Sequence, residues 1–315
     1  MNAGDIRKIG VVGAGLMGHG IALDFAIAGY DVHLHDLSEE LLHTATENIQ
    51  STLKMLTEIG LVTQEQATSA PEKIHPSTEL ENVAADSDVV IEAASEDLEI
   101  KRKIFQSLDK LCPERTILAS NTSSLLPSKL ASATQRPDRV LVTHYFNPPH
   151  LLPLVEVVRG EKTSDETVTV ICDLLTRVGK SPVIVQKEIP GFIGNRLQIA
   201  LFREALSLVQ KGIASPQDVD AVIKNGFGRR LAGAGVFEIW ELAGWDLILA
   251  IAENLVPDLE SATEISPLLK EKVKQGELGT KTGKGFYEWT PESADALKQR
   301  IAPTLIKIAQ QKKTG

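Results

Sequence analysis

The sequence predicts an α/β protein in which a mostly parallel sheet is followed by an all-α domain. Short apolar runs recur as far as Val185, and helix-length segments separate them. Strands that alternate with helices form βαβ units and a mostly parallel sheet. After Ile189-Pro190-Gly191 the short apolar runs stop and long helical patterns follow. We therefore predict an N-terminal domain of residues 1–188, ending at Glu188, and a mainly helical C-terminal domain of residues 189–315.

The predicted elements are placed by their apolar runs and their caps. Lys8–Val12 is predicted as a strand, Met17–Ala28 as a helix that Gly29 ends, and Asp31–His35 as the next strand. Ser38 is a good N-cap and opens a long helix. The other elements predicted in the first domain are Asp88–Ile91, Leu98–Lys110, Thr116–Ala119, Val140–Thr143, Leu154–Val158, a helix between Ser164 and Gly179, and Val183–Val185. In the second domain they are a helix at Phe192–Lys211 and another capped by Ser215.

Composition excludes several classes of protein. With 43% hydrophobic and 24% charged residues, the 315-residue chain has an ordinary soluble balance. A net charge of −9 argues against a nucleic-acid partner, since phosphate binding needs concentrated cations. No secretory leader and no membrane span is expected, because no apolar run approaches about 18 residues. Cys112 and Cys172 lack metal-ligand spacing, so we expect no metal site, free thiols and a cytoplasmic location.

A glycine-rich segment joins the first predicted strand to the first predicted helix. It reads Gly13-Ala14-Gly15-Leu16-Met17-Gly18, a G-x-G-x-x-G pattern. The first glycine allows a tight turn, the second lets a pyrophosphate approach the backbone, and the third lets helix and strand pack closely. Free N–H groups at the helix start then favour an anion. Because of this context, we predict a Rossmann-type dinucleotide site. Its contact residues are Gly13, Gly15, Leu16, Met17 and Gly18.

Asp36, at the end of the second predicted strand, indicates which dinucleotide binds. Its carboxylate is placed to accept hydrogen bonds from the adenosine ribose hydroxyls. The next residues, Leu37 and Ser38, include no arginine for a 2′-phosphate, so NAD is favoured over NADP. The alternative is that Asp36 only caps the following helix, but Ser38 can already supply that cap.

Four polar clusters follow that nucleotide binding alone does not require. They are Asn121-Thr122-Ser123-Ser124, His144-Tyr145-Phe146-Asn147-Pro148, Glu156 inside an apolar run, and Asn195. The first two lie just beyond predicted strands, where open α/β sheets bind their ligands. Histidine suits reversible proton transfer at neutral pH, and a carboxylate on its far ring nitrogen fixes the tautomer. Glu156 has an alternative interpretation as an exposed residue of an edge strand.

These motifs resemble the 3-hydroxyacyl-CoA dehydrogenase family, in the family's order over nearly the whole chain. The matching segments are Gly13 to Gly18, Glu92 to Lys101, Ser120 to Ser124, His144 to Pro148, Leu154 to Glu156, Pro190 to Phe192 with Asn195-Arg196, and Lys281 to Tyr287. The resemblance implies an NAD-dependent dehydrogenase that interconverts an L-3-hydroxyacyl-CoA and its 3-oxoacyl-CoA.

The resemblance also implies roles for individual residues. His144 would be the general base that takes the hydroxyl proton while hydride leaves the same carbon, and Glu156 would orient the imidazole. Ser123 and Asn195 would hydrogen-bond the reacting oxygen or its surroundings. The residues implied in cofactor binding are Glu96, Lys101 and Asn147 beside the nicotinamide ribose, Asn121, and Lys281 from the second domain.

Two departures from the family pattern concern the substrate. CoA-using relatives usually carry a lysine-rich stretch where this chain has Ser51 to Gly60 with the single lysine Lys54, so CoA phosphates would find few partners. Further along, Val236 replaces a proline, and Arg229-Arg230 adds two cations. An arginine can bind a carboxylate bidentately, which leaves a free hydroxy acid as the alternative substrate. A solvated turn or an interface pair explains the two arginines equally well.

Two other classes of protein fit these residues less well. The 6-phosphogluconate-like dehydrogenases use a lysine on the long helix after the sheet domain, and Phe192 to Gln210 contains none. A nucleotide sensor would need neither His144 nor Glu156. We expect a small-molecule substrate, and the resemblance implies a homodimer through the helical domain. The apolar candidates for that contact are Phe237, Ile239, Trp240, Leu242 and Trp245, which core packing explains equally well.

Overall fold

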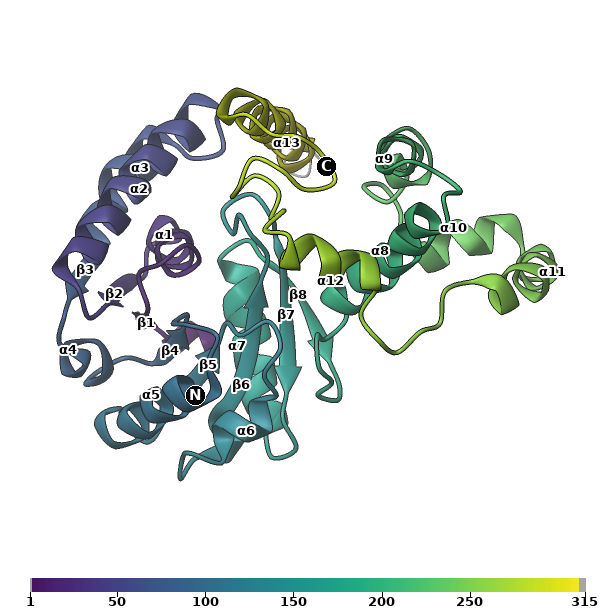
Figure 1. Ribbon diagram of the computed structural model, residues 1–315. Coiled ribbons are helices and arrows are strands. Elements are labelled where there is room, and N and C mark those ends of the chain that lie inside the picture. The colour runs from purple at the N-terminus through teal and green to yellow at the C-terminus, as the bar shows by residue number, and fades with distance from the viewer. Residues whose placement is uncertain (1, 312–315) are drawn as a thin grey trace. The chain divides into compact units, whose positions relative to one another are not determined.

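The chain divides into two compact units, which are described separately. The computed structural model describes residues 2–311 (Figure 1). The first unit runs to Asn195 and the second begins at Arg196, a few residues after the boundary that the sequence predicts at Glu188.

The first unit is built on one eight-stranded sheet in the order β3-β2-β1-β4-β5-β6-β7-β8. The strands are β1 (Lys8–Val12), β2 (Asp31–His35), β3 (Ile74–Ser77), β4 (Val89–Glu92), β5 (Ile117–Ser120), β6 (Val140–Tyr145), β7 (Leu154–Arg159) and β8 (Ser181–Val185). Its helices are α1 (Gly18–Ile27), α2 (Glu39–Glu58), α3 (Gln64–Ser69), α4 (Leu80–Ala84), α5 (Leu98–Leu111), α6 (Pro127–Ala131) and α7 (Asp165–Arg177). Every neighbouring pair of strands is parallel except β6 with β7. The predicted mostly parallel sheet is confirmed.

The central strands are buried because helices cover the sheet on both sides. Figure 1 shows α1 and α5 on opposite sides of the strands around β1. All residues of β4, β5 and β6 are buried, as expected for parallel strands between two helical layers. The side chains at the carboxyl ends of these strands therefore lie at the border between the buried core and the ligand-binding end of the sheet.

Three of the differences from the sequence prediction concern β3, the end of β6 and the start of α8. Strand β3 was not predicted, because Pro76 interrupts its pattern; a proline is tolerated there since β3 is an edge strand. Strand β6 extends to Tyr145, so His144 lies within the strand and not beyond it. Helix α8 begins at Gly194, because Phe192 has a positive φ of 48° that no right-handed helix contains.

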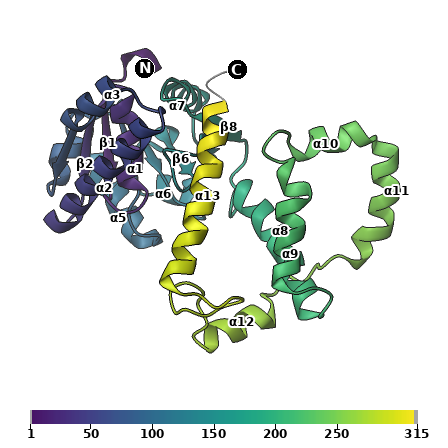
Figure 2. The same cartoon turned by 90° about the horizontal axis from the view of Figure 1, so that it is seen from above.

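The second unit is helical, as predicted. Its elements are α8 (Gly194–Gln210), which starts at the unit boundary, α9 (Pro216–Asn225), α10 (Val236–Ala243), α11 (Trp245–Leu255), α12 (Pro267–Lys274) and α13 (Pro291–Gln311). Figure 2 shows α10 and α11 as an arm extending beyond α8 and α9. Among residues 196–310, only Leu206 and Ser207 are buried. Within residues 2–311, no helix combines the length and apolarity needed to cross a bilayer.

Candidate active site

The glycine-rich loop between β1 and α1 has the shape that a dinucleotide needs. Gly13 adopts φ 104°, which favours glycine. A Cβ on Gly18 would lie 1.7 Å from the Gly13 carbonyl oxygen, so helix and strand can approach only without it. A Cβ on Gly15 would meet no atom within 4 Å. The loop is therefore tight on the protein side and open where a pyrophosphate would approach.

Asp36 fixes this loop and borders an open cavity. Its Oδ2 accepts the Ala14 N–H at 2.8 Å, and its Oδ1 accepts the Leu37 N–H at 2.8 Å. An ionised carboxylate has about four acceptor positions, so two remain for ribose hydroxyls. A cavity of about 640 Å³ is lined by Gly13, Gly15, Asp36 and Leu37 among others. Size, glycines and carboxylate together fit the adenosine half of NAD.

His144 and Glu156 form a buried pair across the antiparallel strands β6 and β7. The two residues face each other in the register, and His144 Nδ1 lies 2.8 Å from Glu156 Oε2. They are 4% and 1% exposed, and β7 lies between β6 and β8, which rules out the edge-strand interpretation of Glu156. Burial would raise the pKa of Glu156, but hydrogen bonds from His144, Gly194 and Ile193 outweigh it and lower that pKa. The carboxylate is thus held ionised beside the imidazole.

Ser123, Asn121 and Asn195 lie at the same edge of the sheet. The Asn121 Oδ1 accepts the Tyr145 N–H at 2.9 Å, which fixes its amide against the end of β6. The Asn195 Nδ2 donates to the Ser123 carbonyl oxygen at 3.3 Å. The fold thus brings together residues that the sequence separates widely. The Ser123 side chain stays exposed.

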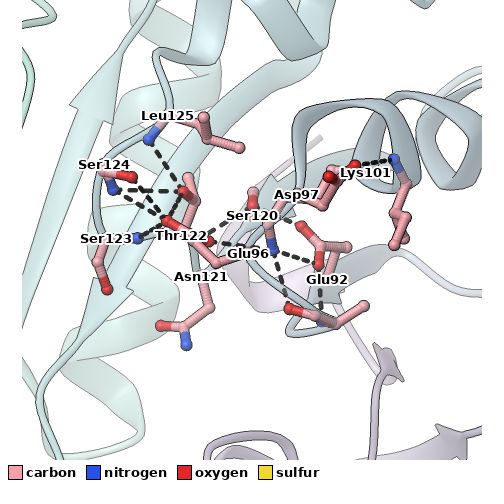
Figure 3. Close-up of polar contacts among 12 residues, drawn as sticks. Glu92, Glu96, Asp97, Lys101, Ser120, Asn121, Thr122, Ser123, Ser124 and Leu125 are labelled. Carbon is pink, nitrogen blue, oxygen red and sulfur yellow. Dashed lines mark hydrogen bonds and ion pairs between the residues drawn. The ribbon is translucent and has the colours of Figure 1, made fainter. Parts of the chain in front are cut away.

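Glu96 holds the turn that carries Ser123. Its Oε1 accepts the Thr122 hydroxyl at 2.6 Å and the Ser123 N–H at 2.9 Å (Figure 3). The N–H and hydroxyl of Ser124 bind the same oxygen at 3.2 and 3.0 Å. Burial opposes ionisation, but the Thr122 bond, the Lys101 charge and the Ser124 and Ser123 bonds lower the pKa of Glu96. An anionic Glu96 therefore ties the segment after β4 to the turn after β5.

Lys101 is buried in the same network, which the sequence analysis did not foresee. Its Nζ lies 2.6 Å from Glu92 Oε1, 3.1 Å from the Ala94 carbonyl oxygen and 3.6 Å from Glu96 Oε2. Glu92 also accepts the Ser120 hydroxyl at 2.6 Å. The side chains of Lys101 and Glu92 are 1% and 0% exposed. The sequence did contain a signal for this network. Glu92 ends the apolar run Val89 to Ile91, and a buried acid needs a buried partner.

Asn147, Lys281 and the two arginines are the other residues that the sequence analysis singles out. Asn147 follows β6 and is exposed. Lys281 belongs to the second unit, between the bridged residues Gly279 and Lys284. Arg229 and Arg230 are exposed in that unit as well, and Arg229 Nε donates to the Lys224 carbonyl oxygen at 3.2 Å. The proposed roles of all four stay predictions. No group of three or more possible metal ligands occurs among residues 2–311.

The chain belongs to the 3-hydroxyacyl-CoA dehydrogenase family. Residues 8–189 match the model of the family's NAD-binding domain, and residues 191–289 match that of its C-terminal domain. The family resemblance found in the motifs is thereby confirmed, as is NAD as the cofactor. The protein is an NAD-dependent oxidoreductase of this family.

Two relatives and one solved structure illustrate the similarity. A probable 3-hydroxybutyryl-CoA dehydrogenase of Bacillus subtilis is 38% identical over 92% of this chain and 100% of its own. A 5-formyl-3-hydroxy-2-methylpyridine 4-carboxylate 5-dehydrogenase of Mesorhizobium japonicum is 32% identical over 96% of this chain and 97% of its own. A crystal structure of an enzyme with that activity, described as an NAD+ dependent dismutase, covers the same shares at 32% identity with a TM-score of 0.90.

Proposed function

We propose that this enzyme oxidises an L-3-hydroxyacyl-CoA to its 3-oxoacyl-CoA, with His144 as the acid–base group. The observation that carries the proposal is the buried contact of 2.8 Å between His144 Nδ1 and Glu156 Oε2. With Nδ1 engaged by the carboxylate, Nε2 is the nitrogen left to exchange a proton with the substrate. Bound NAD supplies the hydride acceptor.

The chain's own residues account for the remaining steps. His144 takes the hydroxyl proton as the carbon loses hydride, and Glu156 stabilises the imidazolium that results. Ser123 and Asn195 donate hydrogen bonds to the reacting oxygen, where negative charge develops in the transition state. In the reverse direction the imidazolium returns the proton to the same oxygen. Glu96 contributes by holding Ser123 in place.

A free hydroxy-carboxylate is the second candidate substrate, and two observations favour it. Helix α2 exposes Glu39, Glu40 and Glu47 against the single cation Lys54, which offers little to the phosphates of CoA. The relative that acts on a pyridine carboxylate also matches more of this chain, 96%, than the CoA-using relative does, 92%.

Parallel assays separate the two substrates. Acetoacetyl-CoA and acetoacetate are each supplied at the same concentration with NADH, and absorbance reports its oxidation. The first proposal expects turnover with the thioester. Turnover with acetoacetate alone would replace it with the second candidate, and turnover with neither would contradict both at this chain length.

Asp36→Ala is expected to weaken NADH binding by about 10- to 100-fold. The change removes hydrogen bonds to a charged acceptor, each worth about 1.5–3 kcal/mol, and also frees the Ala14 N–H of the glycine loop. Fluorescence titration of NADH measures the dissociation constant. The control is Asp31→Ala, which changes an acid at the far end of the same strand and should leave the constant unaltered. Equal constants for the two variants would refute the role of Asp36.

We also infer a homodimer that joins through the second unit, in a cytoplasmic enzyme. Two helices of that unit expose large apolar side chains, with Phe237 77% and Leu242 88% accessible. Trp240 and Trp245 are also exposed. Apolar exposure on this scale is typical of an interface. Both cysteines are free, which suits a reducing compartment. Light scattering should give twice the 34.2 kDa of one chain, and a monomer at micromolar concentration would contradict the dimer.

A further inference from the structure

Glu156 uses its two oxygens for two different partners. Oε2 faces His144 Nδ1 at 2.8 Å. Oε1 accepts the Ile193 N–H at 2.9 Å and the Gly194 N–H at 2.8 Å. The side chain is therefore clamped at both oxygens while only 1% of the residue is exposed. The carboxylate that orients the imidazole is itself oriented by the backbone of residues 193 and 194.

These two amides belong to the start of α8. The first N–H groups of a helix have no partner inside it, and the helix dipole makes this end positive. Helix α8 is 17 residues long and begins at Gly194. The carboxylate of Glu156 thus satisfies N–H groups that would otherwise be unpaired. Asn195 follows Gly194 directly, so its position near Ser123 depends on the same anchor.

Phe192 gives the chain the turn that presents these amides. It has φ 48° and follows Gly191, which has φ 76°. A positive φ is unfavourable for a bulky residue and persists only where its surroundings enforce it. Here the ring is 0% exposed and packs with Val142, Val158 and Val185. Burial of the ring therefore maintains an unfavourable backbone conformation next to Glu156.

Two aromatic rings also contact the imidazole itself. The Phe192 ring centroid lies 5.6 Å from that of His144 in an edge arrangement. The Phe146 ring lies 4.7 Å from it. A Cβ on Gly194 would come within 2.5 Å of Phe146 Cζ, so the start of α8 fits against this ring only as glycine. The imidazole of His144, the carboxylate of Glu156 and the first residues of α8 are therefore packed against one another.

We propose that Phe192 is a positioning residue of the reaction, which acts through Glu156 and His144. Its backbone holds the Ile193 and Gly194 amides on Glu156 Oε1, and its ring fixes the plane of the imidazole. The two amides thereby hold the carboxylate in one position beside the imidazole. The inference rests on the proposed role of His144 as the base.

Phe192→Leu tests the proposal, since it keeps an apolar side chain but removes the ring. The turnover number should fall by about 10- to 100-fold, as expected for a small misplacement of reacting groups. The NADH dissociation constant should stay within twofold, because the glycine loop and Asp36 are untouched. The pH profile of the turnover number for alcohol oxidation should also change, because Glu156 would no longer be held in one position beside the imidazole.

The matched control is Phe105→Leu. Phe105 is also 0% exposed, but it packs in a different core cluster with Val90, Leu108 and Leu118. This variant should lose stability to a similar extent while its turnover number and pH profile remain those of the parent. Phe192→Met, which nearly conserves volume, provides the same comparison if the leucine variant does not fold.

Equal turnover and equal pH profiles for the Phe192 and Phe105 variants would overturn the positioning role. That failure is distinct from failure of the proposed function, which His144→Gln tests independently. If His144→Gln is inactive while Phe192→Leu behaves like Phe105→Leu, only the inference about Phe192 is lost.

Discussion

Replacing His144 with glutamine is expected to lower the turnover number by about 10²- to 10⁴-fold, or about 3 to 5 kcal/mol of activation free energy. Glutamine can donate a hydrogen bond to Glu156, so the buried carboxylate keeps a partner and the fold should persist. It cannot accept the substrate proton at neutral pH. The NADH dissociation constant should change by less than twofold, because none of the contacts at Gly13, Gly15 or Asp36 involves His144.

His150→Gln is the control for this substitution. His150 lies in the segment after the same strand, and burial, with the charges of Lys180 and His19, lowers its pKa to about 4. It is therefore neutral at pH 7 and has no carboxylate partner among the described contacts. Its substitution should leave turnover within a few-fold of the parent. Turnover of His144→Gln above a tenth of the parent value would exclude His144 as the base.

The shape of the glycine-rich loop could be predicted from local sequence because its geometry is local. Gly13, Gly15 and Gly18 lie within one strand–loop–helix segment, and their spacing alone predicts which backbone positions must lack a side chain. Asp36 directly follows the second strand of the first βαβ unit, and its carboxylate contacts the loop at Ala14. Each of these inferences depends on residues close together in the chain, where steric rules are strongest.

The pairing of His144 with Glu156 could not be derived in the same way. It depends on the antiparallel register of β6 and β7, which places the two residues opposite each other, and no local rule sets that register. The family resemblance supplied the pair. It did not supply the second set of bonds to Glu156, from Ile193 and Gly194. Those amides lie 37 and 38 residues further along the chain, directly after Phe192 with its positive φ.

The family motif that contains Lys101 does not determine what this side chain does. The resemblance implies a cofactor contact, and the structure engages Nζ with Glu92, Ala94 and Glu96. Lysine is almost never fully buried without a partner, and here it offsets a carboxylate with no exposure to water. The network joins the ends of β4 and β5, where Ser120 also contributes a hydroxyl. We therefore expect Lys101 to act on stability first and on the cofactor through Glu96.

Lys101→Met is accordingly expected to destabilise the protein by about 3–5 kcal/mol. Removing one partner of a buried ion pair leaves the other charge uncompensated, and methionine cannot offset Glu92. Urea denaturation measures the free energy of unfolding. Lys110→Met, on the exposed last turn of the same helix, should cost less than about 1 kcal/mol.

The double variant Glu92→Gln, Lys101→Met separates charge from packing. It removes both charges from the core, so part of the stability lost in Lys101→Met should return. If the lysine instead contacted the cofactor directly, Lys101→Met would keep the stability of Lys110→Met and lose only NADH affinity. That pattern would contradict the buried network as the main role of Lys101. If Lys101→Met loses stability and the double variant recovers part of it, the main role of Lys101 is to neutralise Glu92. The carboxyl ends of β4 and β5 would then depend on that ion pair.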